Sequence, residues 1–375
     1  MADSSSTSNS DPRPPIRFGV PWGLIGAIVL IVAVEAALRL IGPIKLIAFA
    51  SDEGQYRAVR DFIDAQGPAD VALIGSSQFR EAIAMPRLTE SIEKYAGHDI
   101  WAANYSMRGA RVDVLDAAVR YLLRQPRPPK LIIVGFSPRD LRAKEPDWPR
   151  VAIFWTPADW LREFREHREV LSVMPIVVRN EAGRGLWSLR YREEISLWVQ
   201  RHFARLGVDA SEDRDPIIGE MTAQHVGPKG LAYFEEKGVS KRRLFDRVAD
   251  SYLFDQPPTP PAQMQQRLVS LASQFDRADC RGLWIEMPVA APLAERLKQT
   301  KLKSAFETAV HNAIVGRPID YIVAEDRPVQ FDKTEFRDLQ HLNLPGAQRM
   351  SDWVASEIVS RVKPNQRSTT QPSER

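Results

Sequence analysis

The chain has a single cysteine among its 375 residues, Cys280, so it forms no intramolecular disulfide and builds no cysteine-rich zinc or iron–sulfur site. It also lacks an excess of either charge, because 51 Lys and Arg stand against 48 Asp and Glu. A formal net charge of +3 is too small to indicate a nucleic-acid binder. With 44% hydrophobic and 26% charged residues, the composition excludes a fully disordered chain, a coiled coil, a collagen-like fibre and a multi-span membrane protein.

Motifs for metals and nucleotides are scarce as well. The sequence has no glycine-rich phosphate loop, which sets aside a nucleotide-binding protein, and it has no internal repeat. Five of the six histidines are scattered without the spacing of metal ligands: His98, His167, His202, His225 and His311. We therefore expect neither a metal nor a cofactor.

One long apolar stretch is present, at residues 18–41. No charged residue occurs from Phe18 to Val34, and apolar character continues to Ile41 despite Glu35 and Arg39. A helix needs roughly 20 residues to cross about 30 Å of hydrocarbon, so the stretch predicts a transmembrane anchor. Glu35 and Arg39 lie four residues apart on one helical face, where they either mark the headgroup boundary or contact a partner membrane protein.

A cleaved signal peptide is the alternative, because residues 48–50 (AFA) have the form of a cleavage site. We favour the uncleaved anchor, since the apolar region is too long and Arg39 and Lys45 lie between it and the cut. Residues 1–17 and 364–375 are polar and predict disordered tails. The short first tail and the large downstream region favour a single-pass protein of the cytoplasmic membrane, with its body facing the periplasm or exterior.

The rest of the chain, residues 51–363, alternates apolar strands with helical stretches. This pattern predicts an α/β domain with a parallel sheet and helices on both faces, whose ligands bind at the carboxyl ends of the strands. Strands are expected at residues 69–74, 99–105, 130–136, 282–289 and 319–324. Helices are expected at residues 52–66, 112–123 and 345–362.

The alternation breaks at about residues 142–261, which predicts an insertion or cap on the sheet rather than an independent domain. Helices are expected at 157–169 and 186–206, and a loop at 207–230. The three tryptophans of its first part either pack the insertion against the sheet, which we favour, or stack on sugar rings: Trp148, Trp155 and Trp160.

Candidate catalytic groups follow the strands. The first strand ends in Gly75-Ser76-Ser77, where a sharp turn exposes a hydroxyl at the start of the next helix. The ordinary alternative for such a serine is a helix N-cap. Asp338 and His341 precede the final helix, and their spacing lets the carboxylate hold one imidazole nitrogen while the other faces a serine. The alternative is an exposed loop pair without partners.

The second strand runs into residues 104–109 (NYSMRG), where the N–H of Gly109 can join that of Ser77 in an oxyanion hole. The alternative is a simple entry turn of the next helix. Two arginines near these strand ends, Arg80 and Arg139, are candidates for steering an anionic substrate, although an exposed helix arginine is the simpler interpretation of Arg80.

Together these blocks resemble the SGNH/GDSL hydrolase superfamily. The resemblance covers residues 71–141 and 281–358, and it implies a flavodoxin-like, three-layer fold with Ser77 as nucleophile, His341 as base and Asp338 as its orienting carboxylate. It places Asn104 and Gly109 in the second block. The third block departs from the pattern, since Ser137 stands where the family has an asparagine donor.

The Gly-Ser-Ser block, the Ser-Pro of the third block and the single anchor are similar to a membrane-attached subgroup that handles D-alanyl transfer and polysaccharide O-acetyl groups. This resemblance implies a serine esterase or O-acyltransferase acting on acyl esters of cell-envelope or exopolysaccharide carbohydrate. A polytopic membrane O-acyltransferase is the partner that it suggests. The rival hypothesis is a non-catalytic accessory subunit that keeps the fold and docks such a transferase. The missing asparagine predicts slow hydrolysis of small activated esters, because one oxyanion donor is lost.

Overall fold

The computed structural model describes residues 22–40, 52–96, 99–166, 173–186, 196, 251–323, 326 and 328–362. The tails at 1–17 and 364–375 and the residues of the alternative cleavage site at 48–50 lie outside this part of the chain. So do the loop expected at 207–230 and all but residues 186 and 196 of the helix expected at 186–206.

The centre of the fold is a five-stranded parallel sheet with the order β2-β1-β3-β4-β5. Val71 of β1 pairs with Ala102 on one side and Leu131 on the other, and Gly282 of β4 pairs with Ile319. Because all neighbours are parallel, the carboxyl ends of the strands meet at one edge. The strands are β1 (Val71–Gly75), β2 (Ala102–Asn104), β3 (Leu131–Phe136), β4 (Arg281–Glu286) and β5 (Ile319–Ile322).

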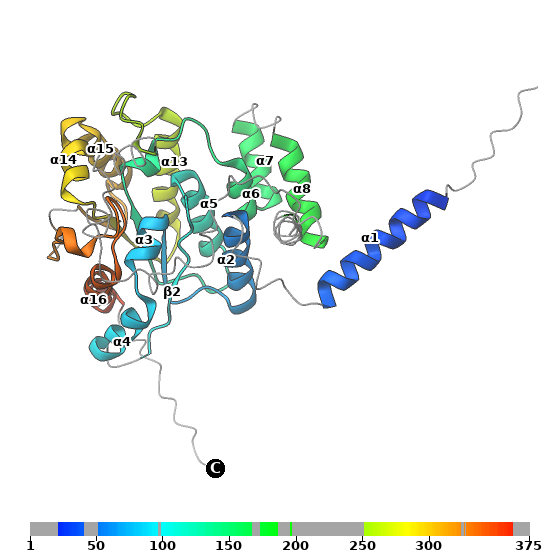
Figure 1. Cartoon of the computed structure of the whole chain (residues 1–375), viewed down its shortest axis with the longest axis horizontal. Coiled ribbons are helices and arrows are strands. Elements are labelled where there is room, and N and C mark those ends of the chain that lie inside the picture. Colours follow the sequence, from blue (N-terminus) through cyan, green and yellow to red (C-terminus); the bar gives the residue numbers. More distant parts are fainter. Residues whose placement is uncertain are drawn as a thin grey trace, which may run out of the picture.

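Helices cover both faces of this sheet. Alternate side chains of each strand enter separate hydrophobic cores: Ala72 and Ile74 of β1 face one core, and Val71 and Leu73 face the other. The first core is closed mainly by α2 (Asp52–Gln66), α5 (Val112–Leu123), α13 (Ala262–Ser273) and α15 (Leu302–Ile314). The second is closed by α3 (Ser77–Ala82), α4 (Met85–Ala96), α14 (Ala291–Gln299) and α16 (Leu344–Arg361), and α4 and α16 lie side by side (Figure 1).

The described part of the insertion packs against the first face. It contains α6 (Trp148–Phe154), α7 (Pro157–Glu166) and α8 (Met174–Gly185), and α6 contacts α2, α5 and α8 (Figure 1). Trp155 and Trp160 are almost fully buried with their ring centroids 4.8 Å apart, so these two side chains pack the insertion and are not open to a sugar. Short 3-10 turns complete the fold: η1 (Pro138–Leu141), η4 (Gln274–Arg277) and η5 (Lys333–Glu335).

Most expected elements are present, with shifts at their ends. The helices expected at 52–66 and 112–123 coincide with α2 and α5, and α16 begins one residue earlier than expected. β2 is much shorter than expected because it is an edge strand that pairs only with β1. β4 ends at Glu286 and is followed by Pro288, which has no N–H for a ladder. The helix α8 was not expected from the sequence, and the helix expected at 157–169 ends at Glu166 in α7, with residues 167–169 outside the described chain.

The N-terminal segment contains α1 (Trp22–Leu40). Among the residues that the structure describes, no helix has the length and apolar character needed to cross a membrane. Residues 18–21 and 41 of the expected anchor lie outside the described chain, so the anchor stays a prediction.

Candidate active site

Two glycines shape the turn that carries Ser77. A Cβ on Gly75 would lie 2.5 Å from the carbonyl oxygen of Gly135 and 2.6 Å from Cβ of Phe79, closer than such atoms approach. A Cβ on Gly135 would overlap the Phe79 ring. Because both positions lack a side chain, Phe79 packs directly on the ends of β1 and β3, and α3 starts tight against the sheet.

The two serines of the turn have different environments. Ser76 has the extended backbone of an N-cap residue, but its side chain makes no capping hydrogen bond and is fully buried. Ser77 is the first residue of α3 and is 8% exposed. The N-cap interpretation therefore does not account for the Ser77 hydroxyl.

Ser77, His341 and Asp338 form one chain of hydrogen bonds. Oγ of Ser77 lies 3.1 Å from Nε2 of His341. The other ring nitrogen, Nδ1, lies 2.9 Å and 3.0 Å from the two carboxylate oxygens of Asp338. With an ionised carboxylate as acceptor, Nδ1 carries the proton and Nε2 is free to accept the serine proton, which is the arrangement of a nucleophile, a general base and an orienting group.

The loop that holds His341 is fixed by its own backbone. Oδ1 of Asp338 accepts the backbone N–H groups of Gln340 and His341, both at 2.9 Å, which explains why a three-residue spacing suffices. Arg337 pairs with Glu81 of α3 at 2.7 Å and so ties the loop to the helix that carries Ser77.

The carboxylate is poised to stay ionised. Burial by itself raises the pKa of Asp338, but the charge and hydrogen bond of His341, the charge of Arg337 and the N–H of Gln340 outweigh it. The pKa of Asp338 is therefore held well below its ordinary value of 3.8.

The second block lies beside the Ser77 turn. Beyond β2, the backbone N–H groups of Tyr105 and Met107 donate to the carbonyls of Leu73 and Gly75, at 2.7 Å and 2.9 Å. The Asn104 side chain donates to the carbonyl of Arg80 at 3.5 Å and accepts the N–H of Ser106 at 3.0 Å. Asn104 thus links the edge strand to α3 and is a positioning group in this structure.

Gly109 has a φ of +69°, a backbone conformation that favours glycine. Its carbonyl accepts from Arg150 at 3.5 Å, and the hydrogen bonds of the described residues do not link it to Ser77. Its expected role as an oxyanion donor stays a prediction.

Arg80 does not point to the nucleophile. Its guanidinium donates to Oε1 of Gln55 in α2 at 2.8 Å and pairs with Glu81 at 3.5 Å. These contacts connect α3 to α2, so they favour a structural role over the expected contact with an anionic substrate.

Ser137 is fully buried and caps η1, where its backbone N–H donates to Asp140 at 2.8 Å and its hydroxyl lies 3.3 Å from the same carboxylate. Burial raises the pKa of that Asp140 carboxyl. The residue that reaches the nucleophile from this block is Arg139, whose Nη2 donates to Oγ of Ser77 at 3.2 Å. The sequence pointed to Arg139 only as a positively charged residue two positions after Ser137, which stands where the family has an asparagine.

A buried tyrosine lies under the same turn. The amide of Gln78, the residue after Ser77, donates to the carbonyl of Gln340 at 3.1 Å and lies 3.5 Å from the Tyr252 hydroxyl. Burial raises the pKa of Tyr252 to about 12, so this phenol stays protonated near neutral pH. Arg142 fixes the segment that carries Tyr252 by donating to the carbonyls of Tyr252 and Leu253, at 3.3 Å and 3.0 Å.

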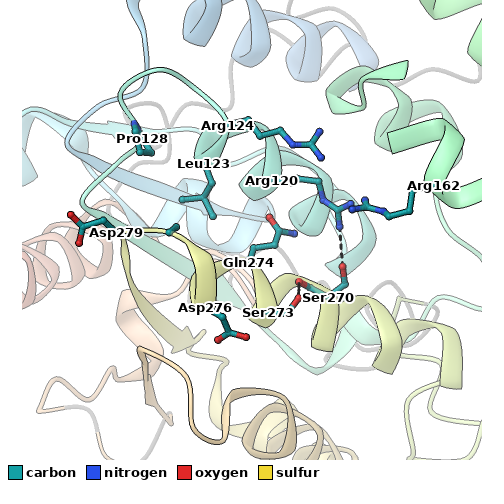
Figure 2. A pocket seen from close by; sticks show the side chains of 11 residues that line it. Arg120, Leu123, Arg124, Pro128, Arg162, Ser270, Ser273, Gln274, Asp276 and Asp279 are labelled. Carbon is teal, nitrogen blue, oxygen red and sulfur yellow. Dashed lines mark hydrogen bonds between the residues drawn. The ribbon is translucent and has the colours of Figure 1, made fainter. Parts of the chain in front are cut away.

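A concave region lies elsewhere in the described part of the fold (Figure 2). It encloses about 630 Å³ and its lining includes the end of α5, the residues before β3 and β4, and η4, which places it toward the amino ends of the strands, away from Ser77. Three arginines line it: Arg120, Arg124 and Arg162.

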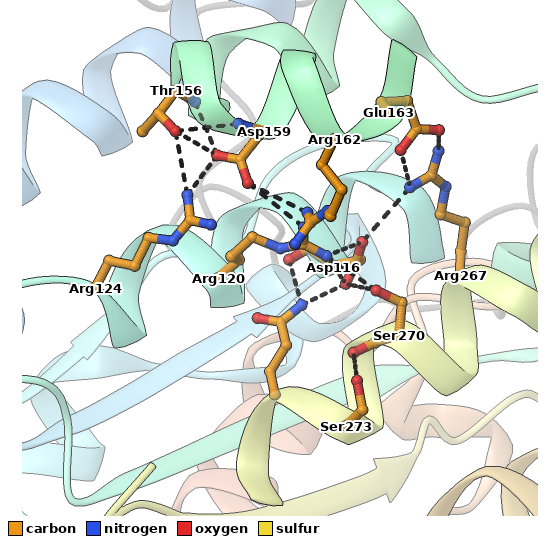
Figure 3. A network of polar contacts seen from close by, with 11 residues as sticks. Asp116, Arg120, Arg124, Thr156, Asp159, Arg162, Glu163, Arg267, Ser270 and Ser273 are labelled. Atoms are coloured by element: carbon orange, nitrogen blue, oxygen red, sulfur yellow. Dashed lines mark hydrogen bonds and ion pairs between the residues drawn. The ribbon is translucent and has the colours of Figure 1, made fainter. Parts of the chain in front are cut away.

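These arginines are already engaged by carboxylates (Figure 3). Asp159 pairs with Arg120 at 3.5 Å, with Arg162 at 3.3 Å and with Arg124. Asp116 accepts from Arg120 and from Ser270 of α13, at 3.1 Å and 3.0 Å. The network joins α5, α7 and α13, and it contains no serine–histidine pair of the kind found at Ser77.

No family model matches this chain, and no curated protein matches it. In the described part of the chain, no group of three or more His, Cys, Asp or Glu side chains is arranged to hold a metal ion. The hydrogen-bonded geometry at Ser77 is therefore the feature of this chain that points to a function.

Proposed function

We propose that this protein is a serine esterase or O-acyltransferase of the SGNH type. The observation that carries the proposal is the hydrogen-bonded chain from Ser77 through His341 to Asp338 at the carboxyl ends of the strands. Three residues from two distant parts of the sequence reach the relative positions that acyl transfer needs. The order 2-1-3-4-5 of the sheet supports the flavodoxin-like fold that the resemblance implies.

In the proposed reaction, Oγ of Ser77 attacks an ester carbonyl while its proton passes to Nε2 of His341. The ionised Asp338 holds Nδ1–H and stabilises the imidazolium that forms. Collapse of the tetrahedral intermediate releases an alcohol, which takes the proton from His341. Water or a carbohydrate hydroxyl then accepts the acyl group by the reverse sequence.

The substrate class and the location come from the sequence. We propose acyl esters of cell-envelope or exopolysaccharide carbohydrate as substrates, a single-pass anchor at residues 18–41 and an outward-facing body. The apolar side chains of α1 support the anchor, because they are exposed to solvent along much of the helix: Ile25, Ile28, Val29, Leu30, Ile31, Val32 and Val34. A membrane O-acyltransferase remains the proposed partner.

Covalent labelling by a fluorophosphonate tests the catalytic proposal. The wild-type protein should be labelled at Ser77, because a neighbouring base activates that hydroxyl. Ser77→Ala should abolish labelling. Ser76→Ala is the matched control and should keep it, since only the Ser77 hydroxyl lies within hydrogen-bond distance of His341.

Variants of the other two residues complete the test. His341→Ala should slow labelling on the order of 10²–10⁴-fold through loss of the general base. Asp338→Asn should also slow it, because the imidazole can adopt the wrong tautomer. Circular dichroism checks that each variant is folded. A label that survives Ser77→Ala in a folded protein overturns the role of Ser77 as nucleophile. A folded wild-type protein that never labels overturns the enzyme proposal and favours the docking subunit.

A further inference from the structure

Arg139 is the one cation whose hydrogen bonds, among the described residues, reach the nucleophile. Its Nη2 lies 3.2 Å from Oγ of Ser77 and 3.5 Å from Oγ of Ser76. A serine hydroxyl has one proton and two acceptor lone pairs. Ser77 can therefore donate to His341 and accept from Arg139 at the same time.

The guanidinium is held in this place from two sides. Nη1 donates to Oε1 of Gln340, the residue before His341, at 3.0 Å. Nε lies 3.4 Å from the carboxylate of Asp140, in the turn after β3. The side chain of Arg139 is only 13% exposed, so its charge is shielded from bulk water and acts more strongly on neighbouring atoms.

The third block of the resemblance supplies an amide donor, and this chain has none there. Ser137 stands at that position, but its N–H and hydroxyl both face Asp140. A donor near the nucleophile is nevertheless required, because attack moves an electron pair onto the carbonyl oxygen of the substrate. That oxygen is separated from Oγ only by the attacked carbon, so a donor within hydrogen-bond distance of Oγ can reach it.

We propose that Arg139 is a catalytic residue that stabilises the oxyanion formed when Ser77 attacks. The inference rests on the proposed function. As the bond from Oγ to the carbonyl carbon forms, the proton of Ser77 passes to His341 and the carbonyl electron pair moves to oxygen. Nη2 of Arg139 shifts its hydrogen bond from Oγ to this oxygen. The electron pair on this oxygen re-forms the carbonyl double bond when the bond to the leaving alcohol breaks, and that alcohol takes the proton from His341.

Arg139 differs from the asparagine amide of the third block in its charge and shape. Its guanidinium is positively charged, so its hydrogen bond to the negatively charged oxygen is stronger than that of a neutral amide. Its forked shape lets Nη1 stay on Gln340 while Nη2 follows the reacting oxygen. On this proposal, Arg139 supplies the oxyanion donor that is lost with the asparagine. We therefore expect that the absence of the asparagine does not by itself slow the hydrolysis of small activated esters.

The test compares variants of the full-length protein in detergent. Arg139→Gln and Arg139→Ala should lower the rate of fluorophosphonate labelling and the kcat for p-nitrophenyl acetate by about 10²–10³-fold, the usual cost of one oxyanion donor. KM should change little, because this neutral ester has no anionic group for the arginine to bind. Arg139→Lys should retain more of the rate than Arg139→Gln.

Two controls separate catalysis from structure. Added guanidinium ion should restore part of the rate to Arg139→Ala, which a purely structural defect does not allow. Arg281→Ala, at the amino end of β4, should label like the wild type because it removes an exposed arginine far along the strands from Ser77.

Each outcome decides a separate point. If wild-type Ser77 never labels, the proposed function and this inference both fall. If the wild type labels and folded Arg139→Gln labels at the same rate, only the role of Arg139 falls. A loss confined to KM, and seen only with anionic esters, also overturns the oxyanion role and indicates an anchor for a substrate anion.

Discussion

At the scale of single residues, the position of Ser77, the proposed nucleophile, depends on two positions without a side chain. Gly75 and Gly135 end β1 and β3 next to each other in the sheet, and Phe79 lies against both. The aromatic ring in turn fixes α3, whose first residue is Ser77. Because these atoms are closely packed, a methyl group added at Gly75 or Gly135 would displace Phe79 and, through α3, Ser77.

We predict that Gly135→Ala displaces Phe79 and lowers both stability and labelling. The added Cβ would lie 2.8 Å from Cβ of Phe79 and overlap its ring. Overpacking of this kind costs about 1–3 kcal/mol in the free energy of unfolding. Denaturant titration and fluorophosphonate labelling measure the two effects.

The double variant Gly135→Ala with Phe79→Leu is the control for that interpretation. A smaller side chain at position 79 should recover part of the loss, so the two substitutions should be non-additive. Wild-type stability and labelling in Gly135→Ala alone would show that Phe79 does not position Ser77.

At the scale of elements, the insertion is attached to the sheet domain by ion pairs as well as by its tryptophans. Asp159 of α7 is 1% exposed and contacts Arg120 of α5 and Arg124, the residue directly after that helix (Figure 3). In the same network, Glu163 pairs with Arg267 of α13 at 3.1 Å. Of the arginines around Asp159, Arg120 is largely buried and also pairs with Asp116, whereas Arg124 and Arg162 are partly exposed to solvent.

We predict that Asp159→Asn destabilises the protein by about 1.5–3 kcal/mol at neutral pH, because a buried carboxylate loses its charge-assisted hydrogen bonds. Burial raises the pKa of Asp159, but the hydrogen bonds of Arg124 and Thr156 outweigh it, so the net shift is downward. A carboxyl whose pKa is lowered by folding contributes stability above its unfolded pKa and loses it as the pH falls through the folded value. The difference between wild type and variant should therefore be constant from neutral pH to about pH 5 and shrink below about pH 4.

Urea unfolding of both proteins across this pH range measures the difference. Asp320→Asn is the control, since Asp320 forms a half-exposed pair with Arg361 at 3.0 Å and should change stability by less than about 1 kcal/mol. An Asp159→Asn effect that is the same at pH 3 as at pH 7 contradicts a contribution from the charged carboxylate.

At the scale of the whole molecule, the proposed anchor would set the side of the membrane on which the proposed reaction takes place. If the α/β domain lies outside the cytoplasm, Ser77 has access to envelope carbohydrate. If that domain lay in the cytoplasm, the membrane would separate Ser77 from this carbohydrate.

We predict that alkaline phosphatase fused after Lys363 is active in intact cells, because that reporter folds only outside the cytoplasm. The chain should also remain with the membrane fraction after an alkaline wash. The same reporter fused after Arg17 should be inactive. An inactive C-terminal fusion that is expressed at a normal level contradicts the outward orientation.

The sequence by itself predicted the parallel sheet and the three residues of the Ser77 site. Strand ends in such a sheet converge on one edge, so a residue directly after β1 and the loop that follows β5 are brought to the same edge. The Asp338–His341 pair is local, since the carboxylate accepts backbone N–H groups of its own loop. Short-range rules of turns and spacing therefore sufficed for these residues.

Only the tertiary structure decided which arginine lies next to Ser77. Arg80 lies three residues after Ser77 in the sequence but turns to Gln55, whereas Arg139 comes from another strand and reaches Oγ. A long, flexible cation has several partners within its reach, and its choice is set by the carboxylates and amides that folding brings around it. Asp140 is already next to Arg139 in the chain, but Gln340 and Ser77 are distant in sequence and reach this arginine only through the fold of the whole sheet domain.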